Sequence, residues 1–171
     1  MFRVVPVFFK ENWHIDELQI GIIMGLNGSI IALFEMIMIN KIEKKRTPIF
    51  FITVGALFFA TSYLLLSAPI VFHVTMAVLV VTIFTVGEMF VLPFINTVVI
   101  SRSNEYNRGL YAAGYTLSWS FAQVIGPMSG FYIAKHLGYD WLWFGIAIML
   151  LCCAYGFRLL NHKSISKLQQ L

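Results

Sequence analysis

Residues 86–96 read VGEMFVLPFIN and lie inside a long apolar run that extends from about residue 69 to residue 100. Three residues interrupt the apolar character of this run: Glu88, Pro93 and Asn96. A carboxylate at membrane depth costs about 2.5–3.5 kcal/mol on insertion scales, so it is retained mainly where it is paired or functional. We therefore interpret the run as a membrane helix that faces the inside of a helix bundle.

The composition of the whole chain agrees with this interpretation. Of the 171 residues, 59% are hydrophobic and 12% are charged, whereas soluble domains are about 45–50% apolar and about 25% charged. A soluble core of this size cannot bury such an excess, so we expect an integral membrane protein in contact with the lipid bilayer. The basic residues behind the net charge of +4 lie in short loops between apolar runs, which argues against nucleic acid as a partner.

Five segments, the run at residues 69–100 among them, define the expected architecture, because a membrane-spanning helix needs about 20 apolar residues. The predicted spans are residues 18–39, 49–67, 69–100, 109–134 and 141–160. Residues 1–9 are interpreted as the end of a helix that begins outside the chain, and residues 161–171 as a tail. The prediction is therefore an all-α integral membrane protein with one membrane domain over residues 1–171.

The loops differ in charge, and this difference predicts an orientation. The basic side chains gather in one alternating set of connections, namely Lys41, Lys44, Lys45, Arg46, Arg102 and Arg108, together with the tail after Arg158. The opposite connections contain only Lys10 and Lys135. Because short cytoplasmic loops are enriched in Lys and Arg, we expect a multi-pass protein of the cell (plasma or inner) membrane with a cytoplasmic C-terminus.

Small residues recur on two of the predicted spans. A stripe of small residues on the first span consists of Gly21, Gly25, Gly28 and Ala32, and a similar pair on the fourth span consists of Gly126 and Gly130. Such stripes allow two helix backbones to approach closely in lipid. Helix packing is the favoured interpretation, and the alternative is a hinge that moves during function, with Pro93 and Pro127 as kink positions.

Two carboxylates lie within the predicted spans and have two possible roles. Glu88 is either a proton-coupling group or a packing carboxylate satisfied by Asn96, Tyr115 or Gln123. Glu35 is either paired with Lys41 or Lys44 or has a gating or proton-coupling role. Asn27, Asn96 and Gln123, with the aromatic residues Tyr115 and Trp119, either pair across helices or bind a small-molecule substrate.

Three stretches together resemble a known family. They are Asn27-Gly28 followed by Glu35 and a basic loop, Gly87-Glu88 with Pro93, and Arg108-Gly109-Leu110-Tyr111 leading to Gly126-Pro127 and Gly130. In order and spacing they resemble the C-terminal half of the major facilitator superfamily, most closely its drug:proton antiporter branch. The chain departs from the family's cytoplasmic-loop motif at Met36, Asn40 and Glu43, and only Lys44-Lys45-Arg46 fits its basic end.

The resemblance implies a carrier of two six-helix halves with substrate held between them. This chain would contain the second half without most of its first helix, and its partner would be the missing N-terminal half. The implied function is proton-coupled efflux of small amphipathic molecules, with Lys41, Lys44, Lys45, Arg46 and Arg108 in cytoplasmic gating loops. Uptake of a sugar, nucleoside or other metabolite, and a non-transporting membrane partner subunit, remain alternatives.

Enzymatic and metal-dependent functions are not expected. Ser129 has no histidine near it at mid-span to act as a base, because His136 and His162 lie outside the apolar runs. Cys152 and Cys153 are adjacent within an apolar run, and no Cys/His spacing indicates a metal site. We therefore expect no enzyme, no metal and no cofactor.

Overall fold

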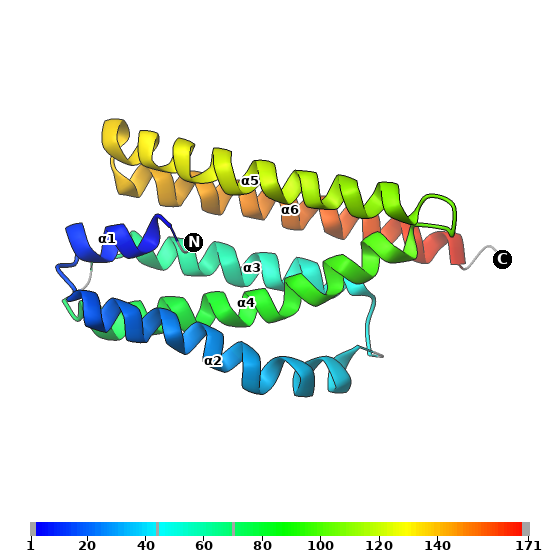
Figure 1. Ribbon diagram of the computed structural model, residues 1–171, viewed down its shortest axis with the longest axis horizontal. Coiled ribbons are helices and arrows are strands. Elements are labelled where there is room, and N and C mark those ends of the chain that lie inside the picture. Colours follow the sequence, from blue (N-terminus) through cyan, green and yellow to red (C-terminus); the bar gives the residue numbers. More distant parts are fainter. Residues whose placement is uncertain (1–2, 44, 70, 169–171) are drawn as a thin grey trace.

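The computed structural model describes residues 3–43, 45–69 and 71–168, and side chains up to residue 159. This part of the chain is helical and contains no strand (Figure 1). Its helices are α1 (Val5–Glu11), α2 (Glu17–Ile42), α3 (Pro48–Leu66), α4 (His73–Ser101), α5 (Arg108–Leu137) and α6 (Tyr139–Leu168). The all-α fold predicted from the apolar runs is confirmed.

Four helices are long and apolar enough to cross a membrane: α2, α3, α4 and the Tyr139–Leu159 part of α6. The helix α5 contains 30 residues, more than the roughly 20 that a span requires, but its polar side chains lower its mean hydropathy and it is not among these four. The five predicted spans each lie mainly within one of the five long helices. Among them α5 therefore stands apart as the polar one.

Local chemistry sets several helix ends. The Asp16 carboxylate accepts a 3.1 Å hydrogen bond from the backbone N–H of Leu18 and so caps the start of α2. Pro48 occupies the first turn of α3, where a missing N–H costs nothing. Gly138 separates α5 from α6 with a φ of 93°, a backbone conformation that favours glycine.

The packed part of the bundle is built around α3, which lies against both α4 and α6. Near the end where α1 lies, aromatic rings fill the space between helices: Phe8 contacts Trp13, Tyr139 and Trp143, and Tyr63 stacks on Trp143. Phe9 and Trp143 are fully buried there. The short α1 is therefore anchored by its aromatic side chains, whereas α5 packs mainly along α6.

The closest backbone approach joins α3 and α4 at two glycines. A Cβ on Gly55 would lie 2.8 Å from the carbonyl oxygen of Gly87 and 2.6 Å from the side chain of Val91. A Cβ on Gly87 would lie 2.8 Å from the ring of Phe59. The two helices can cross this closely only because neither position carries a side chain.

The glycine stripe predicted to pack on α2 behaves differently. A Cβ added at Gly21, Gly25 or Gly28 would meet nothing within 4 Å, and the same holds for Gly126 on α5. Gly130 contacts Val4, whose side chain lies 3.3 Å from the position of a Cβ. The expectation of close packing through the α2 stripe is therefore not met within the described chain, because this face of α2 points away from α3 and α4.

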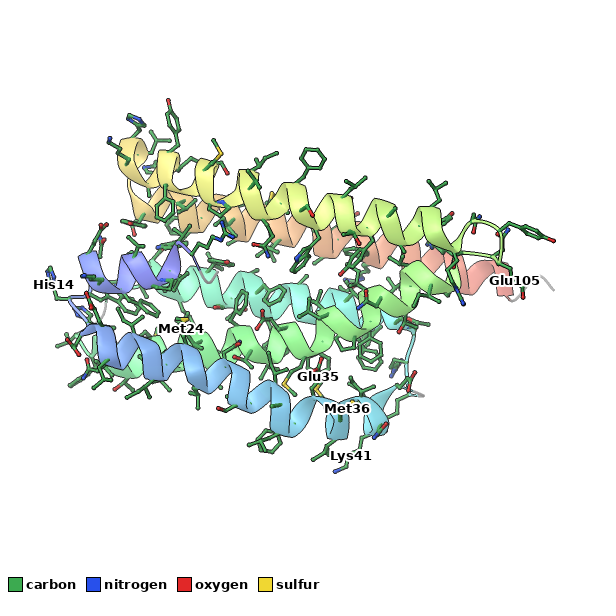
Figure 2. All side chains as sticks on the ribbon, in the orientation of Figure 1. His14, Met24, Glu35, Met36, Lys41 and Glu105 are labelled. Atoms are coloured by element: carbon green, nitrogen blue, oxygen red, sulfur yellow. The ribbon has the colours of Figure 1, made fainter. Side chains whose placement is uncertain are left out.

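The helix directions place the basic connections together. The end of α2, the connection from α4 to α5 and the end of α6 lie at one end of the bundle, opposite α1 (Figure 1). Lys41 and Glu105 mark this end, and His14 marks the other (Figure 2). Lys44, one of the predicted gating residues, lies outside the described residues. The alternation of charge predicted along the chain thus corresponds to two physical ends of the fold.

Candidate functional site

A polar cluster of three side chains lies between α2 and α4. The Asn27 Nδ2 donates a 2.6 Å hydrogen bond to Oε2 of Glu88 and a 2.9 Å hydrogen bond to Oγ1 of Thr85. Asn27 is 6% exposed and Thr85 is fully buried. Polar groups removed from water in this way must find partners within the protein, and here they find one another.

Helical spacing brings the cluster together. Thr85 and Glu88 are three residues apart on α4 and therefore share a face. Asn27 follows Ile20 and Ile23 on α2, and these three are the buried residues of that helix. Their spacing of three and four residues forms the stripe that faces α4. The amide of Asn27 therefore lies on the same face of α2 that packs against α4, and this places it beside the carboxylate.

Two further titratable side chains interact with Glu88 electrostatically: Glu35 from α2 acts on Glu88, and Glu88 acts on Tyr63 from α3. Glu35 follows Asn27 by eight residues, about two helical turns, and is half-buried on the side of α2 toward α4 (Figure 2). The carboxylate of Glu88 is therefore linked to an amide and a second carboxylate from α2 and to a hydroxyl-bearing ring from α3.

The partners expected for Glu88 were wrong. Asn96, Tyr115 and Gln123 were the candidates, and in the described residues no hydrogen bond links any of them to Glu88. Asn96 lies about 12 Å further along α4, at 1.5 Å per residue, and is exposed. Tyr115 and Gln123 belong to α5, which packs mainly on α6 and away from the α2–α4 interface. Asn27, predicted either to pair across helices or to bind substrate, is the residue that bonds to the carboxylate.

Thr85 was missed by the sequence reasoning. A threonine within a membrane helix commonly bonds to its own backbone, and Thr82 and Thr97 on the same helix do so. The signal that could have identified Thr85 was its position three residues before Glu88, because that spacing places a hydroxyl on the same face as the carboxylate.

The substrate residues predicted on α5 share a second face, separate from the Glu88 cluster. Tyr115, Trp119 and Gln123 are spaced by four residues, and Trp119 and Gln123 are exposed. Tyr115 also lines a shallow hollow of about 520 Å³ between α4 and α5, with Val99, Leu110, Tyr111, Gly114 and Ser118. The structure thus divides the predicted site into two parts, the α2–α4 cluster and an open face of α5.

The ion pair predicted between Glu35 and Lys41 is not formed among the described side chains, and the alternative partner, Lys44, lies outside the described residues. Lys41 lies six residues after Glu35 and therefore points to a different side of α2. Lys41 extends away from the bundle at its basic end (Figure 2). Among the side chains that the structure describes, an ion pair is formed instead by Lys10 and Glu17. Of the other basic residues, Arg46 lies over the ring of Phe50 at 5.6 Å, and Lys45 and Arg108 are exposed.

The opposite end of the bundle contains a smaller polar contact. The His73 ring stacks on Trp13 with 5.6 Å between the ring centroids, and its Nδ1 lies 3.2 Å from the backbone oxygen of Trp13. Because a carbonyl oxygen can only accept, the Nδ1 carries the proton and donates. This contact fastens the α1–α2 connection to the start of α4.

The fold and the cluster define a class: a polytopic membrane protein whose interior holds a carboxylate hydrogen-bonded between two helices. The chain belongs to the Major Facilitator Superfamily, whose sequence model matches residues 2–169. This match confirms the family to which the three sequence stretches point. Because the family consists of transporters, the expectation that the chain is not an enzyme is confirmed as well.

A curated relative is similar over part of the chain. The uncharacterized MFS-type transporter YhjO of Bacillus subtilis (strain 168) is 30% identical over 101 residues. The matched part covers 57% of this chain and 25% of the relative. No solved structure matches the chain significantly.

Proposed function

We propose that this chain is part of a proton-coupled carrier that exports small amphipathic molecules, with Glu88 as the coupling carboxylate. The observation that carries the proposal is the 2.6 Å hydrogen bond between Asn27 on α2 and Glu88 on α4. Ionisable groups in membrane helices commonly mark proton or substrate pathways. Here the ionisable group also links two helices, so a change in its protonation state changes the strength of the contact between them.

The chemistry of the bond supports coupling. Asn27 presents N–H donors to Glu88, and an ionised carboxylate accepts such bonds more strongly than a neutral acid does. When Glu88 takes up one proton, the bond loses its charge assistance and the link between α2 and α4 weakens. Loss of the proton restores the link. A carrier that alternates between two arrangements of its helices needs a contact whose strength differs between the two arrangements, as the α2–α4 link would.

The open face of α5 supports a substrate role. Tyr115, Trp119 and Gln123 offer two rings and an amide on one side of the most polar long helix. Rings that carry or neighbour polar groups suit molecules with an apolar body and a polar or charged part. Glu35 is proposed as a second proton-linked group, because it acts on Glu88 from α2. Uptake of a hydroxylated metabolite would use the same face, and the direction of transport distinguishes the two functions.

The partner in this proposal is an N-terminal half that completes the carrier. The open small-residue face of α2 and the exposed α5 face are where its helices would pack, in the two-halved arrangement of the family. The basic end of the bundle would lie in the cytoplasm of the cell, with the C-terminus. Pro93, Pro127, Gly126 and Gly130 remain the proposed hinge positions.

The test uses the complete carrier in membrane vesicles with an imposed pH gradient and a fluorescent amphipathic cation as probe. Glu88→Gln keeps the shape of the side chain but cannot ionise, so gradient-driven probe movement should fall by at least tenfold. The control is Glu105→Gln, which removes a carboxylate from the exposed loop between α4 and α5. Gradient-driven movement that survives Glu88→Gln at the wild-type rate would refute proton coupling through Glu88.

A further inference from the structure

Thr85 is the fully buried member of the polar cluster, and each of its hydroxyl contacts has a definite direction. Its Oγ1 lies 2.7 Å from the backbone oxygen of Val81 and 2.9 Å from Nδ2 of Asn27. A carbonyl oxygen has no proton to give, so the hydroxyl donates to Val81. The lone pairs of Oγ1 are then what remains for Asn27, and they accept from its amide.

This direction fixes the orientation of Asn27. An asparagine amide has an NH₂ side and an oxygen side of almost the same size, and only its hydrogen bonds distinguish the two orientations. Because Thr85 accepts, it selects the orientation in which Nδ2 faces α4. One N–H of that nitrogen then meets Thr85, and the other meets Glu88.

We propose that Thr85 is a positioning residue that sets the protonation behaviour of Glu88 by holding the amide of Asn27 with its N–H groups toward the carboxylate. The inference rests on the proposed role of Glu88 as the coupling group. Among the described residues, the hydrogen bonds of Thr85 go to Asn27 and Val81 and none goes to the carboxylate. Its effect passes through Asn27 and through the hydrogen bond to Val81 that orients its own hydroxyl.

Removal of the Thr85 hydroxyl should therefore change the hydrogen bonding of Glu88. Valine has the shape of threonine without the donor and acceptor, so Thr85→Val keeps the packing but leaves one buried N–H of Asn27 unpaired. The amide is then free to turn its oxygen toward α4, which withdraws the donor from Glu88. Glu35 on α2, which acts on Glu88, and Tyr63 on α3, on which Glu88 acts, are unchanged in this variant.

The experiment is an infrared pH titration of the complete purified carrier, in which the protonated-carboxyl band of Glu88 is assigned by its loss in Glu88→Gln. In Thr85→Val the midpoint should move about one pH unit higher, because the ionised form loses a charge-assisted hydrogen bond. Thr85→Ser retains a hydroxyl and should titrate close to the wild type. Thr82→Val is the matched control, since Thr82 donates the same backbone bond one turn earlier, to Val78.

The outcomes separate this inference from the proposed function. If Thr85→Val titrates like Thr82→Val, Thr85 does not position Asn27, and the role of Glu88 is unaffected. If gradient-driven transport persists in Glu88→Gln, the proposed function fails whatever Thr85 does. If Thr85→Val does not yield folded carrier, Thr85→Ala compared with Thr85→Ser gives the same contrast, and equal midpoints for those two variants would overturn the inference.

Discussion

Two glycine-containing surfaces of this molecule have different environments. At the crossing of α3 and α4, Gly55 and Gly87 lie so close that a Cβ on either would overlap atoms of the other helix. On α2, Gly21, Gly25 and Gly28 face open space. The comparison teaches that a small-residue pattern marks a surface suited to close helix contact, but the pattern alone does not say whether the contacting helix belongs to the same chain.

The same division runs through the whole fold. The helices α3, α4 and α6 form the packed side, with buried rings at both ends, whereas α2 and α5 each present a broad exposed face. Leu18, Ile22, Leu33 and Met36 on α2 are all more than 60% exposed. The Glu88 cluster lies where the packed side meets α2, so a carboxylate at this boundary can respond to movement of α2 against α4.

The largest expected effect comes from placing a side chain in the glycine crossing. Gly55→Leu drives a branched side chain into the backbone of α4, where the Gly87 carbonyl oxygen cannot move aside, so we expect no folded protein. Gly25→Leu is the matched control and should fold, because its Cβ meets nothing within 4 Å. The measurement is the yield of monodisperse carrier after extraction in detergent.

The control also tests the proposed partner. If Gly25→Leu folds but the complete carrier no longer transports, the open α2 face is a contact surface for helices outside the described chain. If Gly25→Leu is as damaging as Gly55→Leu to the yield of this chain expressed alone, the face is not open, and the contrast between the two surfaces is wrong.

Much of this division could be predicted from the sequence, and some of it could not. Long apolar runs identified the helices, because hydropathy over about 20 residues depends only on neighbours along the chain. The pairing of Asn27 with Glu88 joins two residues 61 positions apart in the sequence, and it depends on how α2 packs against α4. The candidates that the sequence offered for Glu88 were instead residues on its own helix and on α5. Thr85 and Gly55 were missed for the same reason, since their roles exist only where two helices meet.

A moderate effect is expected at the end where α1 and α2 join the packed side. His73→Ala removes the Nδ1 donor and the ring that stacks on Trp13, so we expect a loss of about 1–2 kcal/mol in the free energy of unfolding. The control is His14→Asn, an exposed position with φ of 53°, which asparagine tolerates. Equal unfolding midpoints for the two variants would show that the stack does not fasten α2 to α4.

The smallest effect is expected at the ion pair between Lys10 and Glu17, which joins α1 to α2 in an exposed position. The hydrogen bond to Glu17, followed by the charge of Glu17, raises the pKa of Lys10 above its ordinary value. A raised folded-state pKa stabilises the fold fully below the pKa of an unfolded lysine and loses this contribution as the pH rises through the folded value. Because both side chains are largely in solvent, screening should leave almost none of it, and Lys10→Gln should unfold like the wild type from neutral to alkaline pH. A clear destabilisation of Lys10→Gln at neutral pH that disappears at alkaline pH would mean that α1 is held to α2 by charge as well as by its buried rings.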